Sequence, residues 1–319
     1  MDHTSMPAAL APRPLGKTGL QVTPLVLGCA PLSNLPSAFP YEIPEARAMD
    51  VLRAIFQSPI NFLDTGASYG DGEGERRIGV VLRELGGLAD GYVLATKVDR
   101  NLQTGDFSGE QVRRSLERSL ALLRMDRFQL VYLHDPEHTT FEAAMAPGGP
   151  LDVLQRYKEQ GVIEHIGVAG GPIDMMLRYV ETGAFEVAIT HNRYTLLRRE
   201  AAPLLELGAA RGVAIVNAAP YGGGILAKGP EAYPRYRYRP ASSALLERTE
   251  QIAALCRQHE VPLAAAALQF SMRDPRIAAT IVGMTRVERI QETVALATHP
   301  VPDQLWAALE LLALPEEAS

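Results

Sequence analysis

Four ionisable side chains in the first half of the chain are of types that together can move a proton: Asp64, Tyr69, Lys97 and His134. A tyrosine can act as an acid or a base, but its ordinary pKa of about 10 is high for use at neutral pH. A neighbouring ammonium lowers that pKa, so Lys97 is suited to activate Tyr69 and Asp64 to keep Lys97 charged. His134 could hydrogen-bond a substrate oxygen beside Tyr69. Such a set serves a reaction in which an oxygen atom gains or loses a proton.

Each of these residues also has a structural explanation when it is taken alone. Asp64 could cap a turn, Lys97 could be solvated and His134 could be a core histidine, because surface charges and buried histidines outnumber catalytic ones. The informative feature is their position. Three of them end strand-length apolar segments, and Tyr69 follows Asp64 by five residues. Four such residues at equivalent places favour a functional site.

Eight apolar segments of strand length recur along the chain and would position these side chains. They are rich in β-branched residues and do not alternate cleanly, as expected for strands buried on both faces. The segments are 24–28, 60–64, 92–97, 128–134, 164–168, 187–190, 213–217 and 279–283. Helical spacing between and after them indicates helices near 48–56, 78–85, 108–123, 151–160, 173–182, 202–211, 243–273 (broken at Val261–Pro262), 286–297 and 302–314.

The alternation of strand and helix predicts an α/β fold, a (β/α)8 TIM barrel, with functional side chains at the carboxyl ends of the strands. A doubly wound open sheet is the alternative, because periodicity alone does not show whether a sheet closes. Residues 13–22 are expected to form an N-terminal β-hairpin at the bottom of the barrel, and residues 302–314 a C-terminal helix. We expect a single domain over residues 1–319, with residues 1–12 as a flexible N-terminus.

The composition excludes several classes of protein. The 319 residues are 47% hydrophobic and carry 31 Lys and Arg against 37 Asp and Glu, a net charge of −6. A chain of this kind can bury a core, but it lacks the positive field that binds nucleic acid or anionic membranes. No apolar run approaches the ~20 residues of a membrane span, and the N-terminus does not resemble a signal peptide. With two cysteines that favour free thiols, Cys29 and Cys256, we expect a cytoplasmic protein without nucleic-acid or membrane partners.

Several motifs resemble those of the aldo-keto reductase family, and the likeness runs over nearly the whole chain. The motifs are RPLGKTGL at 13–20, NFLDTGASYG at 61–70, ATK at 95–97, LVYLH at 130–134, GVIEHIG at 161–167 and IVGMTRVERIQE at 281–292. The resemblance implies that Asp64, Tyr69, Lys97 and His134 form a catalytic tetrad. It also implies hydride transfer between a nicotinamide cofactor and a carbonyl or hydroxyl carbon.

Cofactor contacts are expected from the second half of the chain, because many barrels bind phosphate with the loops after strands seven and eight. The loop Pro220, Tyr221, Gly222 and Gly223 could bring backbone N–H groups to a pyrophosphate, and Gly283, Met284 and Thr285 open a helix whose N-terminus suits an anion. The family resemblance places Arg289, Glu292 and Thr293 at the adenosine and Asn192 at the carboxamide. It places Gly28, Cys29 and Ala30 at the nicotinamide ribose and includes Asp64 among the cofactor contacts.

The chain departs from the family pattern in three places. It has Ala169-Gly170 where many members have Ser-Asn, and Ala218 where many have an aromatic that stacks on the nicotinamide, for which Tyr221 could compensate. It has Gly283 where members that prefer NADP have a lysine. Losing that cation favours NAD, with NADP as the alternative, although Arg286 and Arg289 remain nearby.

The substrate is indicated less directly. Residues 28–35 and 191–197 resemble the sugar-dehydrogenase branch of the family, whose members oxidise the anomeric hydroxyl of aldoses such as L-fucose, D-arabinose or L-galactose. Aromatic residues make up 6% of the chain, which favours a small polar substrate. Pyridoxal oxidation, broad aldehyde or ketone reduction and a non-catalytic redox-sensing role are the alternatives. The His134–His138 segment could resemble a metal site, but Pro136 disfavours a helix there, so no metal is predicted. The oligomeric state stays open.

Overall fold

The computed structural model describes residues 7–35 and 41–312 of the chain. Eight parallel strands form a closed barrel, because the last strand pairs with both the seventh and the first. This confirms the predicted (β/α)8 barrel and excludes the open sheet. The strands, in barrel order, are β3 (Leu25–Gly28), β4 (Phe62–Asp64), β5 (Val93–Val98), β6 (Phe128–His134), β7 (Ile163–Ala169), β8 (Val187–His191), β9 (Ala214–Ala218) and β12 (Ile277–Gly283).

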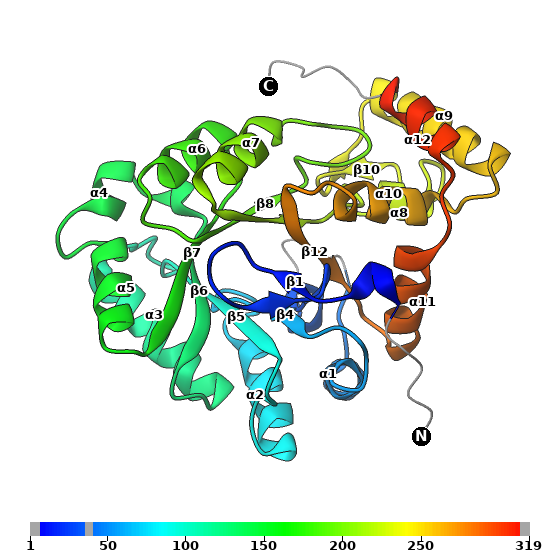
Figure 1. Ribbon diagram of the computed structural model, residues 1–319. Coiled ribbons are helices and arrows are strands. Elements are labelled where there is room, and N and C mark those ends of the chain that lie inside the picture. Colours follow the sequence, from blue (N-terminus) through cyan, green and yellow to red (C-terminus); the bar gives the residue numbers. More distant parts are fainter. Residues whose placement is uncertain (1–6, 36–40, 313–319) are drawn as a thin grey trace.

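Helices surround the barrel, as Figure 1 shows. They are α1 (Glu45–Ile55), α2 (Glu73–Leu85), α3 (Gly109–Leu123), α4 (Phe141–Met145), α5 (Pro150–Glu159), α6 (Ile173–Glu181), α7 (Ala202–Arg211), α8 (Ile225–Lys228), α9 (Ser243–Gln258), α10 (Leu263–Met272), α11 (Val287–Thr298) and α12 (Asp303–Glu310). Each predicted helix is present, and the break before Pro262 separates α9 from α10. The short helices α4 and α8 were not predicted, and neither was the small hairpin of β10 (Arg235–Tyr236) and β11 (Arg239–Pro240).

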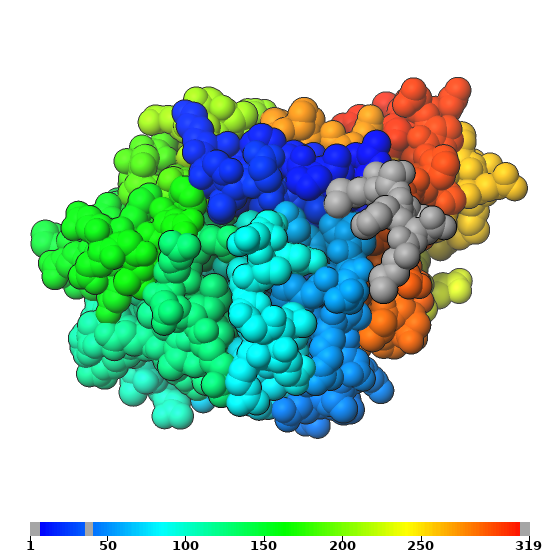
Figure 2. Space-filling view, turned by 60° about the horizontal axis from the view of Figure 1, so that its bottom comes forward, coloured from blue at the N-terminus to red at the C-terminus, as the bar shows by residue number. Residues whose placement is uncertain are grey.

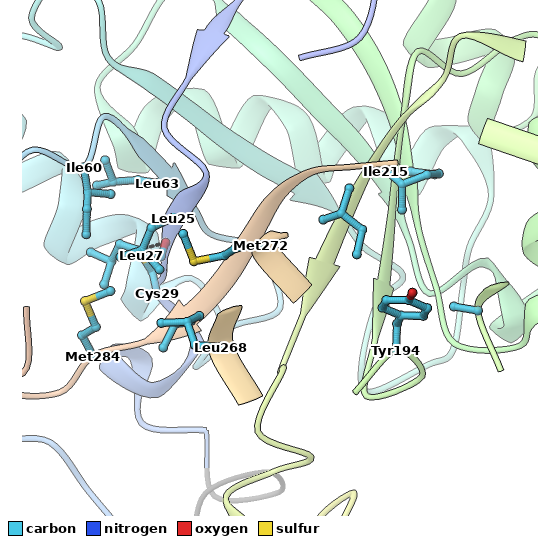
Figure 3. Close-up of a cluster of buried hydrophobic side chains, with 14 of the residues drawn as sticks. Leu25, Leu27, Cys29, Ile60, Leu63, Tyr194, Ile215, Leu268, Met272 and Met284 are labelled. Atoms are coloured by element: carbon cyan, nitrogen blue, oxygen red, sulfur yellow. Dashed lines mark hydrogen bonds between the residues drawn. The ribbon is translucent and has the colours of Figure 1, made fainter. Parts of the chain in front are cut away.

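Side chains alternate between the two faces of each barrel strand. The inward-facing residues pack with one another in a small inner core, for example Val26, Phe62 and Tyr132. The outward-facing ones belong to a larger core between the barrel and the helices. Figure 3 shows part of this outer core, with Leu25 and Leu27 from β3 and Leu268 from α10. Strands buried on both faces lose the period-two pattern, which explains why their sequences read as continuous apolar runs.

The predicted N-terminal hairpin closes the bottom of the barrel. It consists of β1 (Arg13–Pro14) and β2 (Gln21–Val22), and Leu15 and Val22 are fully buried against the inner core. Arg13 donates from Nε to the carbonyl oxygen of Ala278, at the start of β12. Figure 2 shows this N-terminal segment, in dark blue, as a ridge across one face of the molecule.

The ends of the chain differ in part from expectation. Residues 8–10 form a 3-10 helix that contacts α11, and Leu10 is fully buried, so residues 7–12 are not a free tail. Residues 1–6 lie outside the described residues. The predicted C-terminal helix is present as α12, held by Leu305 and Leu309, while residues 313 and 314 of the prediction are not described. Among the described residues, no helix combines the length and apolarity needed to cross a membrane.

Candidate active site

At the carboxyl-terminal mouth of the barrel, the strand ends of one half carry ionisable side chains and those of the other half carry only glycine or alanine. We call these the polar half and the bare half. In each strand, we take the last inward-facing residue, which either belongs to the inner core itself or lies two positions after an inner-core residue, on the same face. From β4, β5, β6 and β8 these residues are Asp64, Lys97, His134 and His191. From β3, β7, β9 and β12 they are Gly28, Ala169, Ala218 and Gly283. The ionisable residues therefore stand on one side of the mouth, and three of the four small residues lie on adjacent strands on the other.

Three members of the predicted tetrad are joined through Lys97. Its Nζ lies 2.6 Å from Asp64 Oδ2 and donates to the carbonyl oxygen of Thr65 at 2.6 Å. The same atom lies 4.7 Å from the ring centre of Tyr69. Tyr69 follows the turn after β4, where its N–H donates to the carbonyl of Gly66. An ammonium has three donors, so one remains for the Tyr69 side of the site.

The charges in this group act on Tyr69 in opposite directions. Burial raises the pKa of Tyr69 above its usual range, and the Lys97 ammonium lowers it by less than that amount. The expected effect of Lys97 thus has the right sign, but the prediction that Tyr69 has a low pKa overlooked its enclosure. Burial by itself would lower the pKa of Lys97, yet Asp64 and Tyr69 outweigh burial and raise it. In the free protein the pair is therefore a neutral phenol beside a fixed ammonium.

His134 completes the tetrad and is held by a partner that the sequence did not reveal. Its Nδ1 lies 2.7 Å from Oδ1 of Asp99, a buried residue just after β5, while its ring meets that of Tyr69 edge-on with centroids 5.7 Å apart. Asp99 also accepts from the N–H of Ser68 at 3.0 Å. Burial would lower the pKa of His134, but the carboxylates of Asp99 and Asp135 raise it. The imidazole is thus oriented and kept able to donate.

Helix α3 supports this arrangement from behind. Ser108 is its N-cap, because Ser108 Oγ accepts from the N–H of Gln111 at 3.3 Å. The Gln111 side chain does not complete a capping box. It donates instead to the carbonyl oxygen of Asp99 at 3.1 Å, and Ser115 Oγ accepts from the N–H of Asp99 at 3.0 Å. Two residues of α3 therefore fix the backbone of the residue that orients His134.

The bare half of the mouth fits a flat cofactor ring. A Cβ added at Gly28 would lie 2.7 Å from Ile281 Cγ2, and one at Gly283 would lie 2.7 Å from Pro31 Cγ. Neither strand end therefore has room for a side chain, and only backbone lines the mouth at these two positions. Next to them, α11 begins at Arg286 without a side-chain cap, so its first N–H groups are available to an anion. This combination fits a nicotinamide dinucleotide.

The Gly-rich loop after β9 has fewer free backbone N–H groups for a pyrophosphate than its sequence indicated. Gly222 and Gly223 take positive φ angles of 62° and 83°, as a tight turn requires. However, the N–H of Gly222 already donates to Ala219 at 3.0 Å within the turn. Tyr221 is half-buried; burial raises its pKa to about 12, and its hydroxyl is buried without a hydrogen-bond partner among the described residues. That hydroxyl is a candidate ligand contact, as is Pro220 beside it.

The predicted cofactor residues Cys29 and Met284 can act only through their backbone, because their side chains belong to the outer core. Thr293 Oγ1 donates to the carbonyl of Arg289 at 2.6 Å, so only its acceptor lone pairs are free. Ala30 and Thr285 are partly exposed beside the bare half of the mouth. Arg289 and Glu292 face each other on α11, with Nη1 and Oε2 2.9 Å apart.

Asn192, predicted to contact the carboxamide, lies just outside strand β8. β8 ends at His191, and Asn192 follows with a positive φ of 56°. The inward position therefore belongs to His191, whose Nδ1 lies 3.4 Å from Asn192 Nδ2. The Oδ1 of Asn192 is buried and has no hydrogen-bond partner within the described part of the chain, so a ligand amide could use it. A one-residue error in the strand boundary hid His191, because successive residues point to opposite faces.

Comparisons with known proteins show which family this chain is similar to. The sequence profile described as the Aldo/keto reductase family matches residues 24–313. The chain is 31% identical over 317 residues to a D-threo-aldose 1-dehydrogenase of a Pseudomonas species, covering 91% of this chain and 94% of that one. It is 29% identical to the pyridoxal 4-dehydrogenase of Microbacterium luteolum, with coverages of 93% and 96%. An aldo-keto reductase from Bacillus halodurans, solved in its holo form, superposes with a TM-score of 0.76 at 23% identity, over 96% of this chain and 97% of that one.

Proposed function

This chain belongs to the aldo/keto reductase family and is an oxidoreductase acting on CH–OH or C=O groups; we propose that its substrate is a small polar aldose, which it oxidises at C1 to a lactone. The observation that carries the proposal is the buried Asp64–Lys97 pair directed at Tyr69, at the polar side of the mouth. The similarity to a D-threo-aldose 1-dehydrogenase supports the sugar.

Each residue of the tetrad has its own role in the proposed reaction. In its phenolate form, Tyr69 takes the proton of the C1 hydroxyl as the hydride leaves C1, so that the C1–O bond becomes the carbonyl of the lactone. Lys97 stabilises this phenolate before it takes the proton, and Asp64 keeps Lys97 in place. His134 donates to the reacting oxygen and holds it beside Tyr69. A bound nicotinamide supplies the two-electron hydride acceptor.

We propose NAD rather than NADP as the preferred cofactor, held across the bare half of the mouth and the start of α11. The proposal rests on Glu292, whose carboxylate lies 2.9 Å from Arg289 Nη1 and 3.9 Å from Arg286 Nη2. The Glu292 carboxylate thus pairs with the two arginines that would otherwise bind the 2′-phosphate of NADP. The hydrogen bond from Arg289 also lowers the pKa of Glu292, so the carboxylate stays charged.

Glu292→Gln is expected to shift this preference. Removing the carboxylate frees both arginines for a phosphate, so the KM for NADP should fall about tenfold while the KM for NAD changes little. Glu288→Gln, one turn earlier on α11, is the matched control and should leave both values unchanged. Equal effects of the two variants, or none, would contradict the proposed role of Glu292. Initial rates with each cofactor at saturating sugar measure the change.

A cytoplasmic location is also proposed. Cys29 and Cys256 are both free and buried, as is common in a reducing compartment.

A substrate panel tests the proposed function. Purified protein is incubated with NAD and L-fucose, D-arabinose or L-galactose, and reduced cofactor is measured beside reactions with pyridoxal and simple aldehydes. We expect the aldoses to give the highest kcat/KM. Pyridoxal is the second candidate, favoured by the 29% identity to a pyridoxal 4-dehydrogenase, and a higher value for it would replace the aldose proposal. Cofactor binding without turnover of any substrate would favour a regulatory role instead.

A further inference from the structure

Two ionisable residues at the mouth have no part in the mechanism described above. His191 ends β8 and follows the inward-facing Val187 and Ile189. Its side chain therefore points to the inside of the barrel, as those of the tetrad residues on β4, β5 and β6 do. Asp135 comes directly after His134, and its Oδ1 lies 3.6 Å from His134 Nε2. Both are partly exposed, as a residue that meets a substrate must be.

The backbone holds Asp135 firmly over the end of the barrel. Its N–H donates to the carbonyl of Ala169 at 2.7 Å, at the end of β7. Its φ is 44°, in the left-handed region, which aspartate tolerates better than most residues but which still costs free energy. Strain of this kind persists where the surroundings impose it, and it is frequent at ligand sites.

The carboxylate of Asp135 lies among the groups of the mouth. It raises the pKa of His134, of Tyr69 and of His191, so it acts on three side chains from three different segments. Within the described ranges, its ion-pair partner is His134 and no lysine or arginine pairs with it. Its side chain keeps a third of its surface exposed. The carboxylate thus retains acceptor capacity towards a ligand.

His191 has room and the right protonation state to bind a hydroxyl. Gly171 leaves space beside its ring, since a Cβ there would lie 3.6 Å from Nε2. Burial lowers the pKa of His191, and the nearby Arg193, His134 and Arg237 lower it further, against Asp135. Both arginines are paired with Glu200, at 2.8 and 2.5 Å. With Asn192 Nδ2 3.4 Å from Nδ1, a neutral imidazole offers its Nε2–H as the donor to a ligand.

We propose that Asp135 and His191 form a hydroxyl-binding subsite that selects substrates with a hydroxyl on the carbon next to the reacting one. This inference rests on the proposed function. The reacting oxygen is placed between Tyr69 and His134, and Asp135 contacts His134, so the neighbouring hydroxyl of a sugar falls within its reach. A carboxylate accepts strongly from a hydroxyl, and a site built for such a bond rejects analogues that lack the group.

The test compares an aldose with its 2-deoxy counterpart. Asp135→Asn keeps the shape and tolerates the left-handed backbone, but it loses the charge. We expect kcat/KM for the aldose to fall about tenfold or more, mainly through KM, while kcat/KM for the 2-deoxy sugar changes less than about threefold. His191→Phe should reduce the same preference. The matched control is Asp71→Asn, since Asp71 has a similar φ of 51° but pairs with Arg118 of α3.

The possible outcomes separate the subsite from the reaction itself. Equal losses with both sugars would mean that Asp135 acts through His134 alone, which would overturn the subsite. An unchanged preference in Asp135→Asn and His191→Phe would overturn it as well. If the wild-type protein oxidises no aldose at all, the proposed function fails first, and the subsite fails with it.

Discussion

Replacing Tyr69 with phenylalanine is expected to lower the rate of aldose oxidation by about a thousandfold or more. The variant keeps the ring that meets His134 edge-on and lies beside Lys97, but it removes the atom that takes the proton. Without that atom, the substrate hydroxyl would have to lose its proton to water in an enclosed site. Cofactor affinity should remain within about threefold, because the bare half of the mouth is unchanged. Steady-state rates and cofactor fluorescence titration measure the two effects.

Tyr179 offers the matched control for this substitution. It lies in α6, is fully buried, and its hydroxyl has no hydrogen-bond partner among the described residues. Tyr179→Phe therefore removes the same atom from a buried ring in the outer core, between the barrel and the helices. It should keep wild-type turnover. A Tyr69→Phe enzyme as active as the Tyr179→Phe enzyme would remove Tyr69 from the mechanism.

Replacing Lys97 with methionine is expected to cost about a hundredfold to a thousandfold in turnover and to change its pH dependence. Lys97 lowers the pKa of Tyr69 against the larger effect of burial. Without the ammonium, that pKa rises further. Oxidation needs Tyr69 as a base, so the pH at which the rate increases should move upwards. A pH profile of kcat/KM for each enzyme shows the shift.

The single substitution also leaves Asp64 buried without its partner, since Nζ of Lys97 and Oδ2 of Asp64 are 2.6 Å apart. An unpaired buried carboxylate destabilises a fold. The double variant Asp64→Asn/Lys97→Met removes both charges and should restore thermal stability without restoring turnover. Recovery of turnover in the double variant would show that Lys97 only neutralises Asp64. An unshifted pH profile in the single variant would contradict its action on Tyr69.

The fold followed from the sequence because its signals are local. Eight apolar runs, each followed by a helical pattern, sufficed to predict the barrel, and the hairpin from 13 to 22 was found where expected. Where a flexible N-terminus was expected, the structure has a 3-10 helix at residues 8–10 with Leu10 buried. Leu10 is the one large apolar side chain among residues 7–12, and its burial depends on α11, about 280 residues further along the chain.

The site was predictable in its types of residue and less so in its pairings. Asp64, Lys97 and His134 are brought together by the parallel strands that carry them. Asp99 was missed because it lies two residues after Lys97, where a carboxylate has no periodic signal, and its role depends on a neighbour 35 positions away. The pKa of Tyr69 was misjudged for a similar reason. A sequence shows which charges are present, but enclosure is a property of the folded mouth.

The most direct test of the account follows the hydrogen atom on C1. An aldose carrying deuterium at C1 is oxidised by the wild-type protein with NAD, and the reduced cofactor and the sugar product are examined by mass spectrometry. We predict deuterium in the reduced nicotinamide, a lactone as the product, and a loss of both signals in Tyr69→Phe. Reduced cofactor without deuterium, or no lactone despite bound cofactor, would contradict the assignment of this mouth as an aldose dehydrogenase site.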